Sequence, residues 1–325
     1  MKGLSPFYYS YLNARVRARR DRYLSREDLK RSLGSSIPEI LSRFRDAASD
    51  ARIDLSMTRR ILARILVDDC HKVISYSPGY ARDVGEAYLF RYGIEDLKTV
   101  IRIWKSHEEA LSYIADQEVL ELAGGGPENL SAYPYLKHMP TFCSLLKKIE
   151  SYSIAELEKA LDLDYFRYLA QLLKDFSGED RRSLNLFLGF QIDVSNIINL
   201  LRLKYYYGHS EEDCLGYMFP PVNIPRRDLE ALIRKDNLQQ AISVLEHTKY
   251  SFLSQAPNVP EMERLISFEK EKITTLFLMG NTFNIGLVFA SIWMAEVEFE
   301  LVGKMVEAKF FNHNELIEGL FNVSA

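Results

Sequence analysis

Cysteine and histidine are scarce in this chain of 325 residues. The three cysteines, Cys70, Cys143 and Cys214, are odd in number and too widely spaced for a metal or redox motif, which is typical of a reducing compartment. The six histidines are dispersed and form no His-Glu-x-x-His pair. In the stretch Asp68–His71, two acids precede a cysteine and a histidine, but neighbours on one helix point in different directions. We therefore expect no metal centre.

Motifs for nucleotide binding and nucleophilic catalysis are missing as well. The single Gly-Lys pair, Gly303-Lys304, continues with methionine and lacks an upstream glycine, which excludes a Walker-type phosphate loop. The glycine run Gly124–Gly126 is followed by proline and indicates a flexible connector. No Gly-x-Ser-x-Gly elbow occurs. We expect a chain that is not an enzyme and that binds no cofactor.

A general excess of positive charge is also missing, since the net charge is −4. Residues 1–31 nevertheless hold nine basic and three acidic side chains, a balance of +6, so the remainder must sum to −10. This asymmetry predicts an acidic partner for the N-terminal segment. That partner is either a second molecule or the glutamate-rich stretch of the same chain that begins at Glu296.

Uncharged runs long enough to cross a bilayer are limited to Ile273–Ala295. Asn281 and Asn284, near the middle of this run, would be costly in lipid. We therefore expect two helices joined by a turn near Gly280–Asn284, with the second helix buried, and no transmembrane span. The N-terminus lacks the apolar core of a signal peptide, because charge arrives by Arg15 after a tyrosine-rich start.

Sustained alternation of apolar and polar residues is absent, and apolar residues instead recur at three and four positions. Proline clusters in three connecting regions and is missing from residues 141–219 and 261–325. Ser25 and Ser153 each stand three residues before an acid, the capping-box pattern of a helix start. The sequence predicts an all-α fold.

Three helical stretches resemble one another: Gly93–Lys105, Asp193–Tyr205 and Glu298–Phe310. With Leu97, Ile197 and Val302 in register, the intervals between them are 100 and 105 residues. Each stretch carries an apolar helix stripe. The three stripes are Ile94, Leu97, Ile101 and Trp104; Val194, Ile197, Leu201 and Tyr205; and Phe299, Val302, Val306 and Phe310.

Polar positions repeat in the first two copies. Asp96 corresponds to Asn196 and Arg102 to Arg202, whereas the third copy has a leucine and a glutamate there. A period near 100 residues is too long for a solenoid and predicts three similar bundles. We expect helical repeats over 1–107, 108–219 and 220–325, arranged as a funnel around an approximate threefold axis. Such a hollow suits a rod-shaped partner.

The opening stretches Tyr11–Arg17 and Tyr23–Leu29, "YLNARVR" and "YLSREDL", resemble the N-terminus of the C subunit of the prokaryotic V/A-type rotary ATPases, which is related to the d subunit of eukaryotic V-ATPase. The repeated motif of that family begins with an acid, continues to an asparagine and ends in Arg-x-Lys. Asp193–Lys204 matches it closely, the first repeat matches less well, and the third keeps only Glu298-Phe299. The resemblance extends over essentially the whole chain.

The resemblance implies a non-catalytic central-stalk subunit of an ATP synthase or ATPase that moves protons or sodium ions. Its partners would be the central shaft subunits, of D and F type, and the proteolipid rotor ring. It would lie on the cytoplasmic side of the membrane, as a peripheral part of the complex and without a span of its own.

In a helix, the opening stretch would gather arginines on one face and aromatic or small residues on another. The first face holds Arg15, Arg19, Arg22 and Arg26. The second face holds Phe7, Tyr11, Ala14 and Ala18. We expect the second face to pack and the arginine face to meet carboxylates.

Asn196 has apolar neighbours, so we expect it to be buried with a hydrogen-bonding partner that fixes the helix register. The candidate contact or structural residues of the opening motif and the repeats are Asn13, Arg15, Arg17, Arg19, Arg22, Arg102, Asp193, Asn196, Arg202 and Glu298.

Two other function classes remain open. A free-standing helical adaptor could bind peptides or rod-like partners in its central hollow. A nucleic-acid binder would use the basic N-terminus, although the −10 balance of the remaining chain opposes it.

Overall fold

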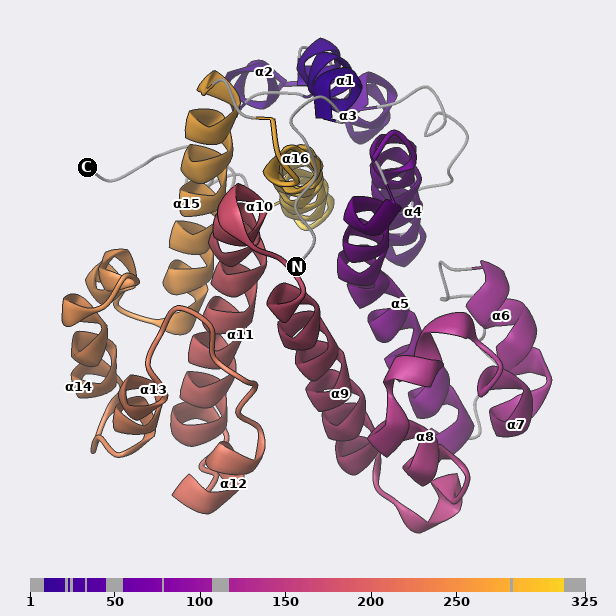
Figure 1. The fold of residues 1–325 in the computed structure, drawn as a ribbon, viewed down its shortest axis with the longest axis vertical. Helices are drawn as coiled ribbons and strands as arrows, with labels where there is room; N and C mark the ends of the chain where they lie inside the picture. Colours follow the sequence, from indigo (N-terminus) through magenta and orange to yellow (C-terminus); the bar gives the residue numbers. More distant parts are fainter. Residues whose placement is uncertain are drawn as a thin grey trace. The chain divides into compact units, whose positions relative to one another are not determined.

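The computed structural model describes residues 9–20, 23, 26–32, 34–44, 55–77, 79–106, 117–280 and 283–312. These residues form helices and contain no β-strand (Figure 1). The predicted all-α class is thus confirmed for the part of the chain that is described. The threefold funnel stays a prediction.

The chain divides into two compact units, and both are discontinuous in sequence. Unit 1 comprises Met1–Tyr9 and Gly126–Gly286, and unit 2 comprises Ser10–Gly125 and Leu287–Ala325. The finer division into three repeats remains a prediction.

Unit 2 joins N-terminal helices to the last helix in the described part of the chain. Its helices are α1 (Ser10–Arg20), α2 (Arg26–Arg31), α3 (Ile37–Phe44), α4 (Leu55–Ser75), α5 (Gly79–Ser106), α6 (Gln117–Gly124) and α16, which begins at Gly286 and ends at Phe310. Leu29, Ile40 and Leu62 of α2, α3 and α4 belong to one apolar cluster with Val302 and Met305 of α16. Burying such side chains contributes about 1.5–3 kcal/mol each, so the two ends of the sequence stabilise the same core.

Unit 1 contains the remaining helices. They are α7 (Gly126–Leu130), η4 (Pro134–His138), α8 (Pro140–Leu146), η5 (Ile149–Ser151), α9 (Ile154–Lys174), α10 (Gly178–Leu184), η6 (Asn185–Gly189), α11 (Phe190–Leu201), η7 (Arg202–Tyr206), α12 (Glu211–Gly216), α13 (Arg226–Ile233), α14 (Leu238–Ser243), η8 (Val244–His247), η9 (Ser251–Gln255) and α15 (Val259–Met279). The glycine run predicted to be a flexible connector does contain a boundary between the two units, and its outer glycines belong to two short helices, α6 and α7, separated by Gly125 alone. The proline regions likewise hold short helices, because proline is favoured at a helix start.

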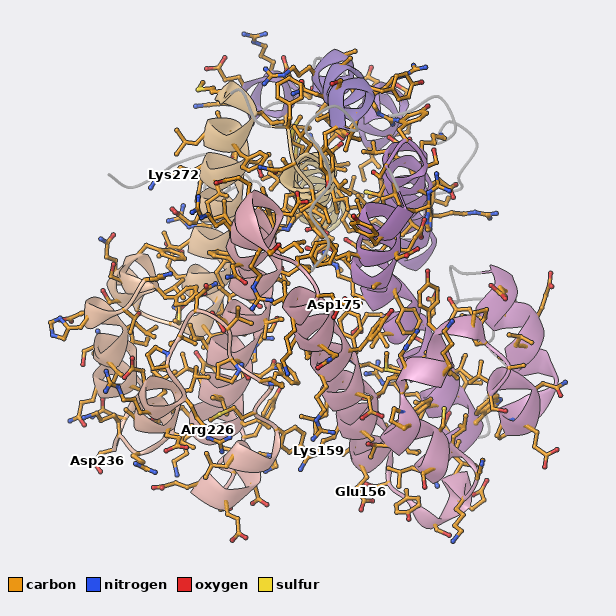
Figure 2. All side chains as sticks on the ribbon, in the orientation of Figure 1. Glu156, Lys159, Asp175, Arg226, Asp236 and Lys272 are labelled. Carbon is orange, nitrogen blue, oxygen red and sulfur yellow. The ribbon has the colours of Figure 1, made fainter. Side chains whose placement is uncertain are left out.

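The capping box predicted at Ser153 is confirmed. The Ser153 side chain accepts a hydrogen bond from the Glu156 backbone N–H, and the Glu156 side chain accepts one from the Ser153 backbone N–H. Glu156 and Lys159 lie at one end of α9 and Asp175 at the other (Figure 2). The capping box predicted at Ser25 falls outside the described residues.

The uncharged run Ile273–Ala295 is broken between α15 and α16, as predicted. Asn284 lies in the break, and its side-chain oxygen accepts hydrogen bonds from Gly286 N–H and the Ser183 hydroxyl at 2.9 and 3.0 Å. Among the described residues, one helical stretch, Gly178–Tyr206, is long and apolar enough to cross a membrane, and 72% of its most apolar window is buried within the protein. Burial of that kind is typical of a core helix.

The three apolar stripes are confirmed as buried faces, except at their last positions and at Phe299, which is partly buried. Leu97, Ile197 and Val302, the residues used to set the register, are all fully buried. Trp104 and Tyr205 are half-buried, and Phe310 is exposed.

Candidate functional site

The second repeat motif, Asp193–Lys204, begins on α11 and ends in η7, within the continuous helical stretch formed by α10, η6, α11 and η7. Asp193 is fully buried, and its carboxylate accepts hydrogen bonds from three consecutive backbone N–H groups. The donors are Val222, Asn223 and Ile224, at 2.8, 2.6 and 3.1 Å. The Tyr250 hydroxyl donates a fourth hydrogen bond at 2.7 Å. One carboxylate therefore ties α11 to the loop after α12 and to the start of η9.

Asn196, one helical turn further on, holds the same loop at a second point. Its side-chain oxygen accepts a hydrogen bond from Phe219 N–H at 2.7 Å, and its amide donates one to the Phe219 carbonyl at 3.1 Å. The prediction that Asn196 is buried and partnered is confirmed, since its exposed fraction is 0%. Together the two side chains satisfy backbone groups that would otherwise be buried without partners. We call Asp193, Asn196 and Tyr250 the loop clamp.

The electrostatics of the loop clamp suit a structural role. Burial raises the pKa of the Asp193 carboxyl above its usual value, while the three backbone N–H donors and Tyr250 act in the opposite direction. Burial and the neighbouring Asp193 charge both raise the pKa of Tyr250, which keeps the hydroxyl protonated as a donor. Each hydrogen bond of Asp193 described above joins two segments of this same chain. The arrangement can fix a loop, and it presents no free acid, base or nucleophile.

Arg202, the arginine of the motif, lies at the surface on η7. It pairs with Glu263 of α15 at 2.8 Å, and both side chains are about two-fifths exposed. In the first repeat, which lies in unit 2, Arg102 corresponds to Arg202 and is exposed. Asp96 corresponds to Asn196 and is buried. Glu298, the acid of the third repeat, is 2% exposed. The structure thus buries Asp96, Asp193 and Glu298 and leaves Arg102 and Arg202 at the surface.

The opening stretch forms α1, but its faces differ from those predicted. Tyr11 is 53% exposed, and Ala14 and Ala18 are exposed too, so the described part of the aromatic and small face is not buried, although the Tyr11 ring meets the edge of Tyr76. Leu12 and Val16 are buried instead, because their spacing of four residues places them on one side of the helix. The prediction that Arg26 shares one helix face with the arginines of α1 is also wrong, because α1 ends at Arg20 and Arg26 begins a separate helix, α2.

The arginines of α1 have different surroundings. Arg15 donates to the Tyr11 hydroxyl at 2.9 Å and lies over the rings of Tyr11 and Tyr76. Arg17 donates to the Asn13 side chain at 2.6 Å. Arg19 forms an ion pair with Asp69 of α4 at 3.3 Å. Arg22 and Phe7 lie outside the described residues. One acid that pairs with α1 is therefore on α4, whereas the sequence left open a second molecule or the glutamates from Glu296 onward.

Glu296 belongs to a buried network that sequence reasoning missed. Arg91 of α5 forms an ion pair with Glu296 of α16 at 2.8 Å, the Tyr88 hydroxyl donates to the same carboxylate at 3.2 Å, and Trp293 donates to the Tyr88 hydroxyl at 2.9 Å. A signal was present, because Arg91 and Glu296 both lie six residues before the register positions Leu97 and Val302. Opposite charges at equivalent positions of two repeats could have indicated a pair.

Metal-binding clusters are absent among the residues that the structure describes. Within Asp68–His71, Asp69 pairs with Arg19, and the His71 side chain faces Glu86 at 2.8 Å.

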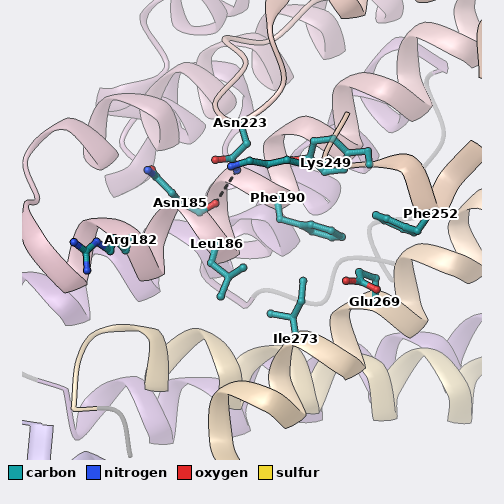
Figure 3. A pocket seen from close by; sticks show the side chains of 10 residues that line it. Arg182, Asn185, Leu186, Phe190, Asn223, Lys249, Phe252, Glu269 and Ile273 are labelled. Carbon is teal, nitrogen blue, oxygen red and sulfur yellow. Dashed lines mark hydrogen bonds between the residues drawn. The ribbon is translucent and has the colours of Figure 1, made fainter. Parts of the chain in front are cut away.

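Next to the loop clamp is a pocket of about 450 Å³, entirely within unit 1 (Figure 3). Its walls come from η6 and α11 on one side and from α15 on the other, and residues 249–252 close one end. The Asn223 amide donates to the Asn185 carbonyl at 2.9 Å, the dashed contact in Figure 3. Tyr250 and Asn223, which bind Asp193, are thus also walls of the pocket.

Residues 12–320 match the protein family described as ATP synthase (C/AC39) subunit. Among curated proteins, the chain is similar to the C subunit of the A-type ATP synthase of Methanothermobacter thermautotrophicus, with 25% identity over 94% of this chain and 85% of the relative. It is also similar to the proteins of that name from Methanosarcina mazei (28% identity; 84% and 79% covered) and Pyrococcus abyssi (24%; 74% and 68%). The family match takes in both units and the loop clamp, so this chain belongs to the ATP synthase (C/AC39) subunit family.

Proposed function

We propose that this chain is a non-catalytic central-stalk subunit that couples the rotating shaft of a V/A-type ATP synthase or ATPase to its membrane rotor ring. The observation that carries the proposal is the family match over residues 12–320, in line with relatives named as C subunits of A-type ATP synthases. The partners would be shaft subunits of D and F type and the proteolipid ring. The chain would lie peripherally on the cytoplasmic side of the membrane.

The proposal includes the arrangement of three bundles, 1–107, 108–219 and 220–325, as a funnel around an approximate threefold axis. Three buried stripes in one register support it. The loop clamp and the Arg91–Glu296 network support a role in transmitting torque, because networks whose members are hydrogen-bonded make a structure rigid. A protein that transmits torque must resist deformation.

Reconstitution of the rotary complex in sealed vesicles, with and without this chain, tests the proposal. We expect the complex without the chain to hydrolyse ATP but to lose ATP-driven ion transport, and the added full-length chain to restore transport. Ion transport that is equal with and without the chain would overturn the proposal. Binding of unrelated peptides, with no affinity for the shaft subunits, would support the adaptor function instead.

A further inference from the structure

The pocket beside the loop clamp combines an apolar interior with a cation at its rim. Phe190 and Phe252 lie with nearly parallel rings, 6.2 Å between centroids and 9° between planes, and Leu186 and Ile273 complete the apolar wall. Its volume of about 450 Å³ falls in the usual range of binding pockets, roughly 300–1,000 Å³. The walls are fixed in advance, because Tyr250 and Asn223 are bound by Asp193.

The apolar surface continues from the pocket along α15. Ile273 lines the pocket, and Leu276 and Met279 follow at intervals of three residues, so that each lies beside the one before it on the helix surface. Leu276 is 61% exposed and Met279 is 67% exposed, while Leu186 on the opposite wall is 39% exposed. From Ile273 to Met279 this strip is about 9 Å long at 1.5 Å per residue. That length matches nearly two turns of a second helix.

The charges around the pocket leave one cation unmatched. Arg182 pairs with Glu179, and Glu269 pairs with Lys272. Lys249 lines the pocket, is exposed, and forms no hydrogen bond or ion pair with any residue in the described part of the chain. A ligand that places a carboxylate at Lys249 would complete the charge balance.

We propose that the pocket and the α15 strip bind an amphipathic helix of a partner protein, with a bulky apolar side chain in the pocket and an acidic side chain at Lys249. Two helices of this chain form the walls of a groove, and a partner helix would place residues at i, i+3 or i+4, and i+7 along it. The inference rests on the proposed function only in that it takes the chain to work within a multi-subunit complex.

The test uses full-length variants added to the complex that lacks this chain. The double variant Leu276→Asp/Met279→Asp should weaken binding to the complex at least about tenfold, since central apolar contacts dominate interface affinity. Lys249→Glu should weaken binding, and Lys249→Arg should preserve it. Tyr207→Asp is the matched control, because Tyr207 is a 71% exposed apolar residue of the same unit outside the groove, and its binding should change less than about twofold.

A photo-crosslinking residue at position 276 identifies the occupant. We expect cross-links to a helical segment of another subunit that carries an acid next to apolar residues. Cross-links within the same chain, cross-links to lipid, or equal binding by the double variant and the Tyr207 control would overturn the inference. The proposed function fails separately, through unchanged ion transport without the chain.

Discussion

Single side chains in this protein hold segments that are far apart in sequence. Asn196 binds both the N–H and the carbonyl of Phe219, 23 residues away. An asparagine side chain can do this because its oxygen accepts and its amide donates. Asn196 of the repeat motif therefore holds α11 to the loop that contains Phe219.

Replacing Asn196 with leucine tests this tie. We expect Asn196→Leu to lower the free energy of unfolding by about 1–3 kcal/mol, because two buried backbone groups lose their partners. Chemical denaturation measures the effect, and Asn199→Leu on the half-buried side of the same helix is the control. An unchanged or raised denaturation midpoint for Asn196→Leu would refute the tie.

The arginines of α1 should differ in their effect on stability. The Arg19 side chain is 15% exposed, and its partner Asp69 is 6% exposed. We expect Arg19→Gln to cost about 1–3 kcal/mol, because it removes the charge that pairs with a buried carboxylate. Arg15→Gln and Arg17→Gln should leave stability nearly unchanged, because both residues are exposed. Melting midpoints of the three variants provide the comparison.

Binding by the same variants addresses whether arginines of α1 meet a partner protein. If Arg15 and Arg17 contact a partner, their variants should fold normally and bind the shaft subunits more weakly. Normal binding by both, together with normal folding, would remove them from the proposed interface.

At the scale of elements, caps made by side chains define where helices begin. Asp164 of α9 accepts hydrogen bonds from the backbone N–H groups of Thr141 and Phe142 at 2.7 and 3.0 Å, at the start of α8. Asp180 of α10 accepts one from Ile285 N–H at 2.9 Å. These carboxylates satisfy donors that a helix or turn leaves free. The sequence indicates such acids only when they are local, as at Ser153 and Glu156.

The capping box of α9 gives an element-scale prediction with a pH dependence. Hydrogen bonds from the Ser153 backbone and hydroxyl lower the pKa of Glu156 below its usual 4.5. Because the folded-state pKa is the lower one, the contribution to stability is present above the unfolded-state pKa and is lost as pH falls through the folded-state pKa.

We therefore expect Ser153→Ala to cost about 1 kcal/mol at neutral pH. The difference from the wild type should shrink as the pH is lowered below 4.5, the usual pKa of Glu156. Denaturation curves at several pH values measure both effects. A difference that stays constant or grows toward acid pH would contradict the capping mechanism.

At the scale of the whole molecule, unit 2 depends on both ends of the sequence. Val302, Met305 and Val306 of α16 lie in one cluster with residues of α2, α3 and α4. The Arg91–Glu296 pair adds a buried electrostatic link between α5 and α16. Unit 2 should therefore fold only when the C-terminal segment is present.

A truncation after Gly286 tests this dependence. We expect the truncated chain to lose the cooperative unfolding of unit 2, with helicity reduced beyond the fraction that the deleted residues contribute. Amide hydrogen exchange should show lost protection in α4 and α5. Full protection of α4 and α5 in the truncated chain would show that unit 2 needs no contribution from α16. Glu296→Gln in the full-length chain is the milder variant, and we expect partial loss of protection in the same helices.

The sequence by itself determined the helical class, the buried stripes, the break after Gly280 and the buried Asn196. These features follow from periodicity and local capping, which act over a few residues and are written in the order of the chain. The repeat motif also identified Asp193 as a candidate structural residue. The motif did not predict the four groups that donate hydrogen bonds to it.

Only the tertiary structure decided which distant groups meet. Tyr250 on Asp193, Asp69 on Arg19 and Glu296 on Arg91 join residues separated by 50 or more positions. The side of α1 that packs was decided in the same way, since Leu12 and Val16 outweigh Tyr11 once a core is available. Such pairings depend on how helices are placed in space, and the burial of each helix face is set by its neighbours rather than by its own sequence.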